Sequence, residues 1–293
     1  VDIAVIEVGL GGRLDSTNII TPEVSVITNI GWDHMNILGN SLVEIAYEKG
    51  GIIKENVPVV VGEVLPETRP VFEKIAKEQQ APLIIANEHE YAAEWQIKNH
   101  ELEVMVAERD TDKRETYHLD LAGYYQTKNL MTVLSTVKQL QHRGWHIDLP
   151  HIHKALKQVK KLTGLHGRWE VIREHPMVVL DVGHNEDGIR QVLAQIELTD
   201  HQHLHMVVGF VKDKDISKVI SLLPKEAKYY FTRARIPRAL PEDELMQKAN
   251  AAGLEGVAYP DVNTALKAAL HHAEKRDLVL VCGSVFVVGE VEI

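Results

Sequence analysis

The sequence predicts two α/β domains in series, the first built on a mostly parallel sheet that helices cover. Short apolar segments alternate with helix-length segments over roughly the first 86 residues, a rhythm typical of βαβ units. The rhythm restarts beyond the polar, glycine-bearing stretch at residues 160–164. We therefore place the first domain at residues 1–163 and a second α/β domain at residues 164–293.

The expected strands are of two kinds. Buried parallel strands are short apolar runs bounded by turn residues, and in the first domain they fall at residues 1–8, 24–30, 58–61 and 82–86. Half-solvated antiparallel strands alternate polar with apolar residues, as residues 101–106 and 117–121 do. In the second domain, buried strands are expected near residues 177–181, 204–209, 229–232 and 278–282.

Helices of the first domain are expected at residues 41–51, 66–80, 125–142 and 150–161. The first of these has signals at both ends. Ser41 is its expected N-cap, and Glu44 is placed to reach back as in a capping box. Gly50 and Gly51 follow the last turn, and glycine accepts the left-handed backbone that often ends a helix.

The N-terminal segment is unusual. Residues 1–8 carry acids and no basic start, which argues against a signal peptide. A buried parallel strand needs a neighbour on each side, and nothing precedes this one in the sequence, which also begins without methionine. We therefore expect that the sequence is truncated or lacks its leading residues.

Composition excludes several classes of protein. The chain has 42 acidic and 32 basic residues, for a net charge of −10, which argues against nucleic acid as the main partner because phosphate binding needs a basic face. No apolar run approaches the roughly 20 residues of a membrane helix. The single cysteine, Cys282, excludes an internal disulfide and a CxxC zinc site. A reducing cytoplasm is the expected location.

Polar residues in the first domain occur where predicted strands and helices end. Glu7 and His34 each lie at or just past the carboxyl end of a predicted parallel strand, the edge at which open α/β sheets bind ligands. A carboxylate and an imidazole can hold Mg²⁺ together with waters and phosphates, although either side chain alone is more typical of a satisfied polar group at a strand end. Asp33 either orients His34 or caps the loop. Lys49, in the last turn of a helix, offsets the helix dipole.

The second domain repeats this pattern. Asp181 and His184 follow a predicted strand and precede a predicted helix. His184 has the chemistry of a base or a hydrogen-bond donor, and Asp181 that of an anchor for a ribose or a cation. Arg168 follows the proposed boundary and has the chemistry to bind a phosphate. Taken singly, each of these residues is as typical of a structural role as of a functional one.

One glycine-rich motif fits neither common nucleotide-binding pattern. Residues 7–18 read Glu-Val-Gly-Leu-Gly-Gly-Arg-Leu-Asp-Ser-Thr-Asn. The dinucleotide-binding GxGxxG pattern requires glycine where Leu14 stands, and no glycine in the chain is followed by lysine, as a P-loop requires. The motif instead resembles the signature of the folylpolyglutamate synthase/dihydrofolate synthase family, within the Mur-ligase superfamily.

Further segments carry the same resemblance in family order. Residues 27–34, 44–54, 126–129, 167–168, 181–185, 209–215 and 283–284 are similar to successive family blocks. Departures are Gly50 in place of alanine, His166 in place of proline, and Val182 in place of a small residue. The resemblance implies a Mur-ligase-like central ATPase domain, truncated before residue 1, followed by a Rossmann-like α/β C-terminal domain.

The resemblance also implies roles for individual residues. It implies that Glu7 and His34 are magnesium ligands and that Lys49 is carboxylated, with its carbamate helping to hold a second cation. The pterin side of the substrate site is implied to be lined by Leu14, Asp15 and Ser16. ATP is implied to contact Asn129, Arg168 and Asp181 across the domain interface, and the incoming glutamate to lie near His184 and Ser284.

The implied reaction is amide formation in two steps. ATP phosphorylates the carboxylate of dihydropteroate or a tetrahydrofolate, and the amine of L-glutamate attacks the acyl phosphate. The cofactors implied are ATP and Mg²⁺, and a monomer is expected. Two alternatives remain: a UDP-muramoyl amino-acid ligase of the same superfamily, against which residues 9–18 argue, and a non-catalytic folate- or nucleotide-binding remnant.

The 293-residue chain by itself is expected to be inactive or nearly so. The family's Gly-rich phosphate loop is not among its residues, and backbone N–H groups of such a loop hold the ATP phosphates. The check is a glutamate-incorporation assay with ATP, Mg²⁺ and dihydropteroate or tetrahydrofolate, run beside an intact-mass measurement. ATP-dependent glutamate ligation by a protein of 33.0 kDa would contradict this expectation.

Overall fold

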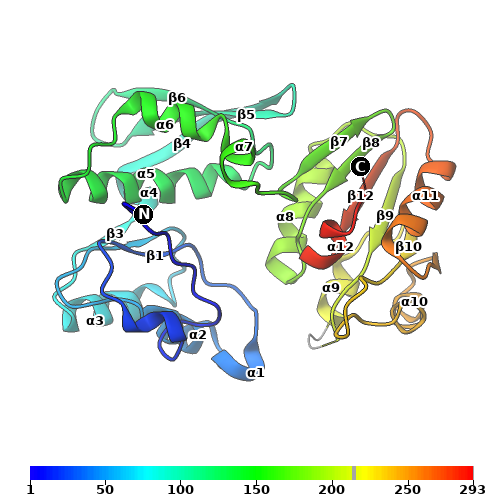
Figure 1. Ribbon diagram of the computed structural model, residues 1–293, viewed down its shortest axis with the longest axis horizontal. Coiled ribbons are helices and arrows are strands. Elements are labelled where there is room, and N and C mark those ends of the chain that lie inside the picture. Colours follow the sequence, from blue (N-terminus) through cyan, green and yellow to red (C-terminus); the bar gives the residue numbers. More distant parts are fainter. Residues whose placement is uncertain (213–215, 293) are drawn as a thin grey trace. The chain divides into compact units, whose positions relative to one another are not determined.

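A computed structural model describes residues 1–212 and 216–292, and their contacts divide the chain into two compact units. The first unit contains Val1–Lys98, Leu102–Leu119 and Tyr125–Lys157, and the second contains Asn99–Glu101, Asp120–Tyr124 and Gln158–Ile293. The units therefore part at Lys157, close to the predicted domain boundary after residue 163. Figure 1 shows the elements of each unit.

The first unit contains a three-stranded parallel sheet covered by helices. Strands β1 (Ser25–Ile27), β2 (Val59–Val61) and β3 (Leu83–Ile85) pair in that order. Helices α2 (Leu42–Gly50) and α3 (Arg69–Glu78) pack on one face, where their apolar side chains share a core with β1 and β2. These elements were all predicted from apolar runs and helical periodicity, with bounds that differ by a few residues.

Helix α5 (Gln126–His142) lies between this sheet and a second one (Figure 1). The second sheet has the order β4 (Glu90–Lys98), β5 (Glu101–Glu108), β6 (Arg114–Leu119). Leu130, Met131 and Leu134 of α5 share a core with Val60 of β2 and with the apolar side chains of β5 and β6. Helix α6 (Leu149–Leu156) packs on β6.

The second sheet has the alternating burial that the sequence predicted. Leu102, Val104 and Val106 of β5 are buried and the residues between them are not, and β5 pairs with β6 in antiparallel register. Strands β4 and β5 are joined by Asn99 and His100, which both have positive φ, 51° and 60°. Two positive φ values are the geometry of a type I′ hairpin turn.

The second unit contains a six-stranded sheet of order β11-β10-β9-β12-β8-β7. Its strands are β7 (Glu170–Glu174), β8 (Met177–Leu180), β9 (Leu204–Val208), β10 (Lys228–Phe231), β11 (Gly256–Ala258) and β12 (Leu278–Cys282). All neighbours are parallel except the β7–β8 pair. The helices are α8 (Glu186–Glu197), α9 (Ser217–Leu222), α10 (Glu242–Ala251), α11 (Val262–His272) and α12 (Val285–Gly289). The predicted fold class is confirmed.

Buried side chains on both faces of this sheet explain its continuous apolar strands. Val207 of β9 and Val279 and Val281 of β12 pack with α11 and α12, and the intervening residues of the same strands, such as Met206 and Leu280, are also buried. A strand covered on both faces has no polar side to alternate with. Within the part of the chain that the structure describes, no helix is long and apolar enough to cross a membrane.

Four short elements complete the described part of the chain: η1 (Ser16–Ile19), α1 (Met35–Leu38), α4 (Ala86–His89) and α7 (Val159–Thr163). The helix predicted at residues 150–161 is wrong in one respect, because it is interrupted between α6 and α7. The Asp120 carboxylate accepts a hydrogen bond from the Lys160 backbone N–H at 3.0 Å, so a side chain distant in sequence supports the start of the second helix.

The strand predicted at residues 1–8 is absent. The segment is extended coil, and Ile3, Val5 and Ile6 are exposed. A strand forms only when its backbone N–H and C=O groups pair with a neighbour, and among the described residues none pairs with this segment.

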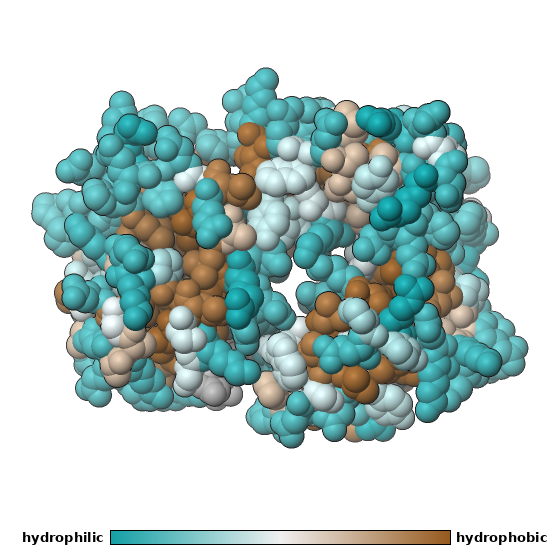
Figure 2. Space-filling view, turned by 180° about the vertical axis from the view of Figure 1, so that it is seen from behind, coloured by the Kyte–Doolittle hydropathy of each residue, from teal (hydrophilic) through white to brown (hydrophobic). Residues whose placement is uncertain are grey.

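Hydrophobic residues reach the surface of both units (Figure 2).

The C-terminal end of α2 also differs from the prediction. Gly51 has φ −62°, in the right-handed region, so the expected left-handed cap does not form. Ser41 does cap the helix by accepting from the Glu44 N–H. The Glu44 carboxylate reaches back one residue further than predicted, to the Asn40 N–H at 2.7 Å.

A buried polar chain lies at the start of β9 and β12. His205 is fully buried, and its Nε2 lies 3.2 Å from an Oδ of Asp277, which is 2% exposed. Its Nδ1 lies 3.0 Å from the Tyr230 hydroxyl, which in turn lies 3.2 Å from His272 Nδ1. Burial raises the pKa of Tyr230 to about 12, so the phenol remains a donor. The consistent arrangement has neutral His205 donating to an ionised Asp277.

His205 is expected to make the folding stability pH-dependent. Burial lowers the pKa of His205, although the hydrogen bond and charge of Asp277 oppose this. Below the unfolded pKa of roughly 6.5, the unfolded chain binds a proton that the folded chain does not. Stability should therefore fall as pH falls through this region, by at most about 1.4 kcal/mol per pH unit from this group.

The measurement is urea unfolding at pH 7.5 and 5.5 of the unmodified protein and His205→Gln. Glutamine retains a donor for Asp277 and an acceptor for Tyr230 but does not titrate. The pH dependence should be smaller in His205→Gln and unchanged in His146→Gln, a control at an exposed position. Equal pH dependence in all three proteins would show that His205 does not contribute.

Candidate functional site

The glycine-rich loop of residues 9–18 lies against the C-terminal end of α2. The Arg13 N–H donates to the Glu48 carbonyl at 2.8 Å, and the Arg13 guanidinium pairs with the Glu48 carboxylate at 2.9 Å. The Asn18 side chain donates to the Gly51 carbonyl at 3.0 Å. These contacts place the predicted substrate-side residues next to the turn of helix that carries Lys49.

Glycine is required on both sides of this contact. A Cβ on Gly51 would lie 2.4 Å from the Arg13 Cα, and a Cβ on Gly12 would lie 2.8 Å from Ile52 Cγ2 and 3.0 Å from the Glu48 and Lys49 carbonyl oxygens. Real side chains do not approach backbone this closely. The two glycines therefore allow the loop and the helix to meet.

Lys49 is partly buried in the last turn of α2. Burial lowers the pKa of its ammonium group, and the negative charge of Asp33 opposes that shift. Asp33 is therefore close enough to Lys49 to act on it electrostatically. Among the described residues, no carboxylate forms an ion pair with Lys49. A lysine of lowered pKa has a larger neutral fraction, which is the nucleophilic form.

Asp15 organises the loop that follows. Its carboxylate accepts from the Thr17 hydroxyl at 2.6 Å, the Thr17 N–H at 2.9 Å and the Leu10 N–H at 2.9 Å. These hydrogen bonds, that of the Thr17 side chain first, lower the pKa of Asp15. Leu14 is 79% exposed and Ser16 is exposed. The predicted substrate residues thus combine a structural carboxylate with side chains open to solvent.

The two predicted magnesium ligands lie in different kinds of local structure. His34 has φ 50° at the start of α1, and its Nε2 lies 3.7 Å from an oxygen of Asp33. Glu7 is exposed in the extended N-terminal segment. Among the described residues, no three His, Cys, Asp or Glu side chains gather as a metal site. The donors fit Mg²⁺ in part, because this ion is usually held by one or two carboxylates with phosphates and waters.

Asn129 occupies the second turn of α5 and is exposed, with its amide donating to Gln126 at 2.8 Å. One turn further along, the Thr132 hydroxyl lies where a Cβ on Gly62 would come within 2.3 Å of it. Gly62 follows β2, so this part of α5 is near the carboxyl edge of the parallel sheet. The structure therefore brings Asn129 to the edge that α/β sheets use for ligands.

In the second unit, the buried Asp181 carboxylate accepts hydrogen bonds from backbone N–H groups at the end of β8. It is 3% exposed, and its oxygens accept from the Trp169 N–H at 2.9 Å and the Gly183 N–H at 2.8 Å. Trp169 has φ 49°, an unfavourable backbone for a bulky residue. Asp181 thus stabilises the turn that presents Arg168, a partly buried side chain.

His184 and Ser284 end neighbouring strands. Strands β8 and β12 pair in parallel, and the Gly283 N–H donates to the Gly183 carbonyl at 3.0 Å, which joins the two loops. His184 Nδ1 lies 3.0 Å from the Val182 carbonyl. Since a carbonyl only accepts, Nδ1 carries a proton. Ser284 is 5% exposed and caps α12 by accepting from the Phe286 N–H.

The structure thus forms two groups of the predicted residues. The loop of residues 9–18, Asp33, His34 and Lys49 belong to the first unit, and Arg168, Asp181, His184 and Ser284 share the carboxyl edge of the second unit's sheet. Sequence reasoning assigned no role to Arg13, Asn18 or Lys54. Lys54 donates to the Asn18 carbonyl at 2.7 Å. Their polar side chains in a glycine-rich motif were the available signal.

Both units match known protein domains. Residues 1–137 match the family described as Mur ligase middle domain, and residues 167–285 match Mur ligase, glutamate ligase domain. The dihydrofolate synthase/folylpolyglutamate synthase of Bacillus subtilis is 31% identical over 99% of this chain and 67% of its own length. A Haloferax volcanii protein, named as a bifunctional folylpolyglutamate synthase/dihydropteroate synthase, is also 31% identical over 99% of this chain.

Solved structures agree with the sequence matches. Mycobacterium tuberculosis folylpolyglutamate synthase, solved with ADP and AMPPCP, gives a TM-score of 0.85 at 26% identity, over 99% of this chain and 67% of that one. Escherichia coli FolC, in complex with DHPP and ADP, gives 0.79 at 28% identity, over 96% and 63%. The chain spans 34% of the Haloferax protein's length and about two thirds of the others.

Fold, site and domain matches define the chain as the middle and glutamate-ligase domains of a Mur ligase. The glycine-rich loop, its contact with the lysine-bearing helix and the identity to the Bacillus protein narrow the assignment further. The chain belongs to the folylpolyglutamate synthase/dihydrofolate synthase family, as the resemblance of residues 7–18 predicted.

The charge of Asp33 is expected to control the pKa of Lys49. Asp33→Asn removes the one negative charge that opposes the burial effect, so the pKa of Lys49 should fall further. The measurement is the rate of Lys49 acylation as a function of pH, quantified by peptide mass spectrometry. Asp110→Asn, at an exposed hairpin position, is the control and should change nothing. A higher pKa of Lys49 in Asp33→Asn would contradict this account.

Proposed function

We propose that the protein containing this chain is an ATP-dependent ligase that adds L-glutamate to dihydropteroate, to (poly)glutamylated tetrahydrofolate, or to both. The observation that carries the proposal is the contact between the loop of residues 9–18 and the turn of α2 that ends in Lys49. It brings the residues assigned to the pterin side next to a lysine of lowered pKa. The relatives' names and the nucleotides in their structures support the same reaction.

In the first unit, Leu14, Asp15 and Ser16 are assigned to the substrate. The hydrogen bonds of Asp15 hold the loop, so that the exposed Leu14 and Ser16 are positioned before substrate arrives. Lys49 is assigned as a carbamate, formed when its neutral amine adds to CO₂ and loses a proton. This change replaces a positive by a negative charge at Lys49, whose charge Asp33 influences.

Glu7 and His34 are assigned to Mg²⁺, with the Lys49 carbamate serving a second cation. Mg²⁺ would offset the charge on the phosphoryl oxygens of the nucleotide. Asn129 is assigned to ATP, at the carboxyl edge of the first unit's parallel sheet.

In the second unit, Arg168 and Asp181 are assigned to ATP, and His184 and Ser284 to the incoming glutamate. Asp181 is occupied by two backbone N–H groups, so its main contribution is to position the turn of Arg168. His184, whose Nδ1 donates to the Val182 carbonyl, is assigned as a base or hydrogen-bond donor for the amine that attacks the acyl phosphate. Exclusion of water from the acyl phosphate protects it from hydrolysis. We also infer a cytoplasmic monomer.

The decisive assay measures incorporation of radiolabelled glutamate by the complete protein that contains this chain. Dihydropteroate, tetrahydrofolate and a UDP-muramoyl substrate are compared, each with ATP and Mg²⁺. Glutamate should be added to one or both pterins and not to the UDP-linked sugar. Lys49→Gln should lower the rate by about a hundredfold or more, because it removes charge at the reacting phosphates. Lys77→Gln, an exposed lysine on α3, is the matched control.

A second readout tests the carbamate without relying on turnover. In ¹³C-bicarbonate, the protein should give a carbamate carbon signal that Lys49→Gln loses and Lys77→Gln keeps. Glutamate addition without any Lys49-dependent signal would overturn the carbamate assignment but keep the ligase. Activity only on the UDP-linked sugar would overturn the ligase proposal itself.

A further inference from the structure

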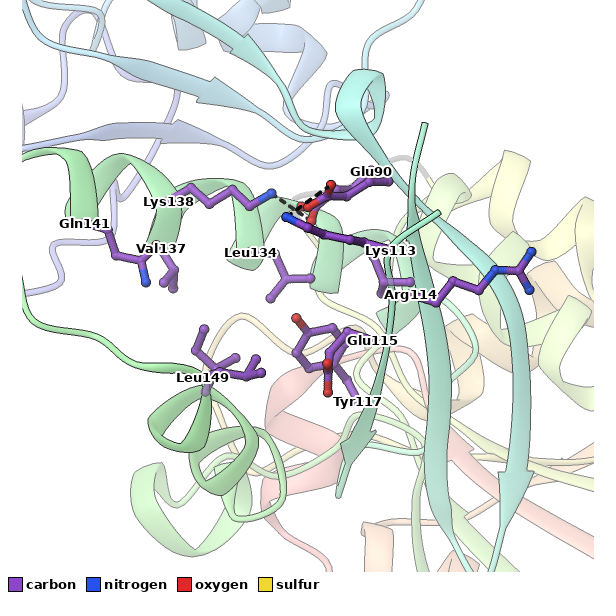
Figure 3. A pocket seen from close by; sticks show the side chains of 13 residues that line it. Glu90, Lys113, Arg114, Glu115, Tyr117, Leu134, Val137, Lys138, Gln141 and Leu149 are labelled. Carbon is purple, nitrogen blue, oxygen red and sulfur yellow. Dashed lines mark ion pairs between the residues drawn. The ribbon is translucent and has the colours of Figure 1, made fainter. Parts of the chain in front are cut away.

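A cavity of about 390 Å³ lies in the first unit between α5, α6 and the antiparallel sheet. None of the residues assigned above lines it, so it is separate from the proposed catalytic groups and does not depend on the proposed function. Its volume is within the range of roughly 300–1,000 Å³ that small-molecule sites occupy. Figure 3 shows the side chains around it.

Five apolar side chains line part of the cavity. Leu134 and Val137 come from α5, Leu149 and Ile152 from α6, and Val106 from β5. In Figure 3, Leu134 and Val137 lie across the gap from Leu149. Helix α6 has eight residues, of which only Leu156 is buried. The turn of α6 that carries Leu149 and Ile152 therefore leaves space between itself and α5.

Tyr117 contributes one polar group to these walls. Its ring stacks on His153 with centroids 5.0 Å apart, and the residue is 6% exposed. Figure 3 shows its hydroxyl turned into the gap, and no hydrogen bond to this hydroxyl forms within the described residues. Burial, and after it the charges of Glu115, Glu90 and Glu108, raise the pKa of Tyr117 to about 12, so the phenol keeps its proton at neutral pH.

Five of the six charged side chains that line the cavity lie near a partner of opposite charge or a histidine. Glu90 lies 2.7 Å from Lys138, and the Glu115 carboxylate lies 2.9 Å from His153 Nε2. Glu108 accepts from the Thr111 hydroxyl at 2.7 Å and lies 4.0 Å from Lys113. A charged ligand would have to displace one of these partners, so the rim favours a ligand without net charge.

We propose that this cavity binds a small, uncharged, planar aromatic molecule whose polar edge accepts a hydrogen bond from the Tyr117 hydroxyl. Apolar side chains from α5 and α6 favour a flat aromatic body, and the Tyr117 hydroxyl beside them sets its orientation. The Tyr117 hydroxyl faces the open space of the cavity, where a ligand acceptor takes the place of water as its hydrogen-bond partner.

The experiment uses quinoline as the probe and naphthalene as its matched control, which has the same shape without an acceptor nitrogen. Binding to the 293-residue chain is followed by amide chemical shifts on α5, α6 and β6. Quinoline should bind saturably with a Kd below about 1 mM. Naphthalene should bind about 5- to 10-fold more weakly, the effect of one net hydrogen bond.

Three variants locate the binding. Tyr117→Phe removes only the hydroxyl and should weaken quinoline 5- to 10-fold, to the level of naphthalene, whose own affinity should not change. Leu134→Trp fills the cavity and should abolish binding of both probes. Val133→Ala, on the exposed face of the same helix, should bind as the unmodified protein does, since Val133 is 42% exposed.

Absence of shift changes on α5 and α6, or quinoline binding that survives both Tyr117→Phe and Leu134→Trp unchanged, would overturn the proposal. If Leu134→Trp fails to fold, Tyr117→Phe still decides the test, because it removes only the hydroxyl group and little side-chain volume.

Discussion

The close approach of the loop of residues 9–18 to the C-terminal end of α2 is the constraint on which the first unit's site depends. The contact joins backbone to backbone at Arg13 and Gly51, so no rotation of a side chain could relieve a larger residue there. It covers the last turn of the helix, and burial of that turn is the first cause of the lowered pKa of Lys49. The two glycines thus allow the loop to meet the turn of helix that carries Lys49.

In the second unit, hydrogen bonds position the loops of the predicted site. Asp181 accepts from two backbone N–H groups and holds Trp169 at a positive φ, while Ser284 caps α12. Both residues therefore organise the loops at the carboxyl edge of the sheet whether or not they touch a ligand. If variants of Asp181 or Ser284 lose activity, the loss would reflect both weaker ligand binding and a change in the loops that these residues hold. Arg168 and His184 are better probes of ligand contact, because their side chains hold less of the backbone.

Sequence patterns predicted most of the fold because burial follows simple periods. The apolar strands of the second unit and the alternating residues of β5 lie where their patterns placed them. The end of β8 also predicted the edge at which Asp181 lies. The patterns failed where partners decide the outcome: residues 1–8 form no strand without a paired neighbour, and the interruption between α6 and α7 depends on Asp120. The Tyr117 cavity was not predictable, since it is space between elements.

The size of that cavity determines how it can be filled. An enclosed, dry cavity of 390 Å³ would cost about 9 kcal/mol at roughly 24 cal/mol per Å³, which is comparable with the whole stability of a domain. The cavity is therefore open to water, and water against Leu134, Val137 and Leu149 makes few hydrogen bonds. An aromatic ligand that releases this water gains the hydrophobic free energy that packing of α6 on α5 leaves unused. The incomplete packing of a short helix thus supplies the driving force for binding, and Tyr117 supplies the orientation.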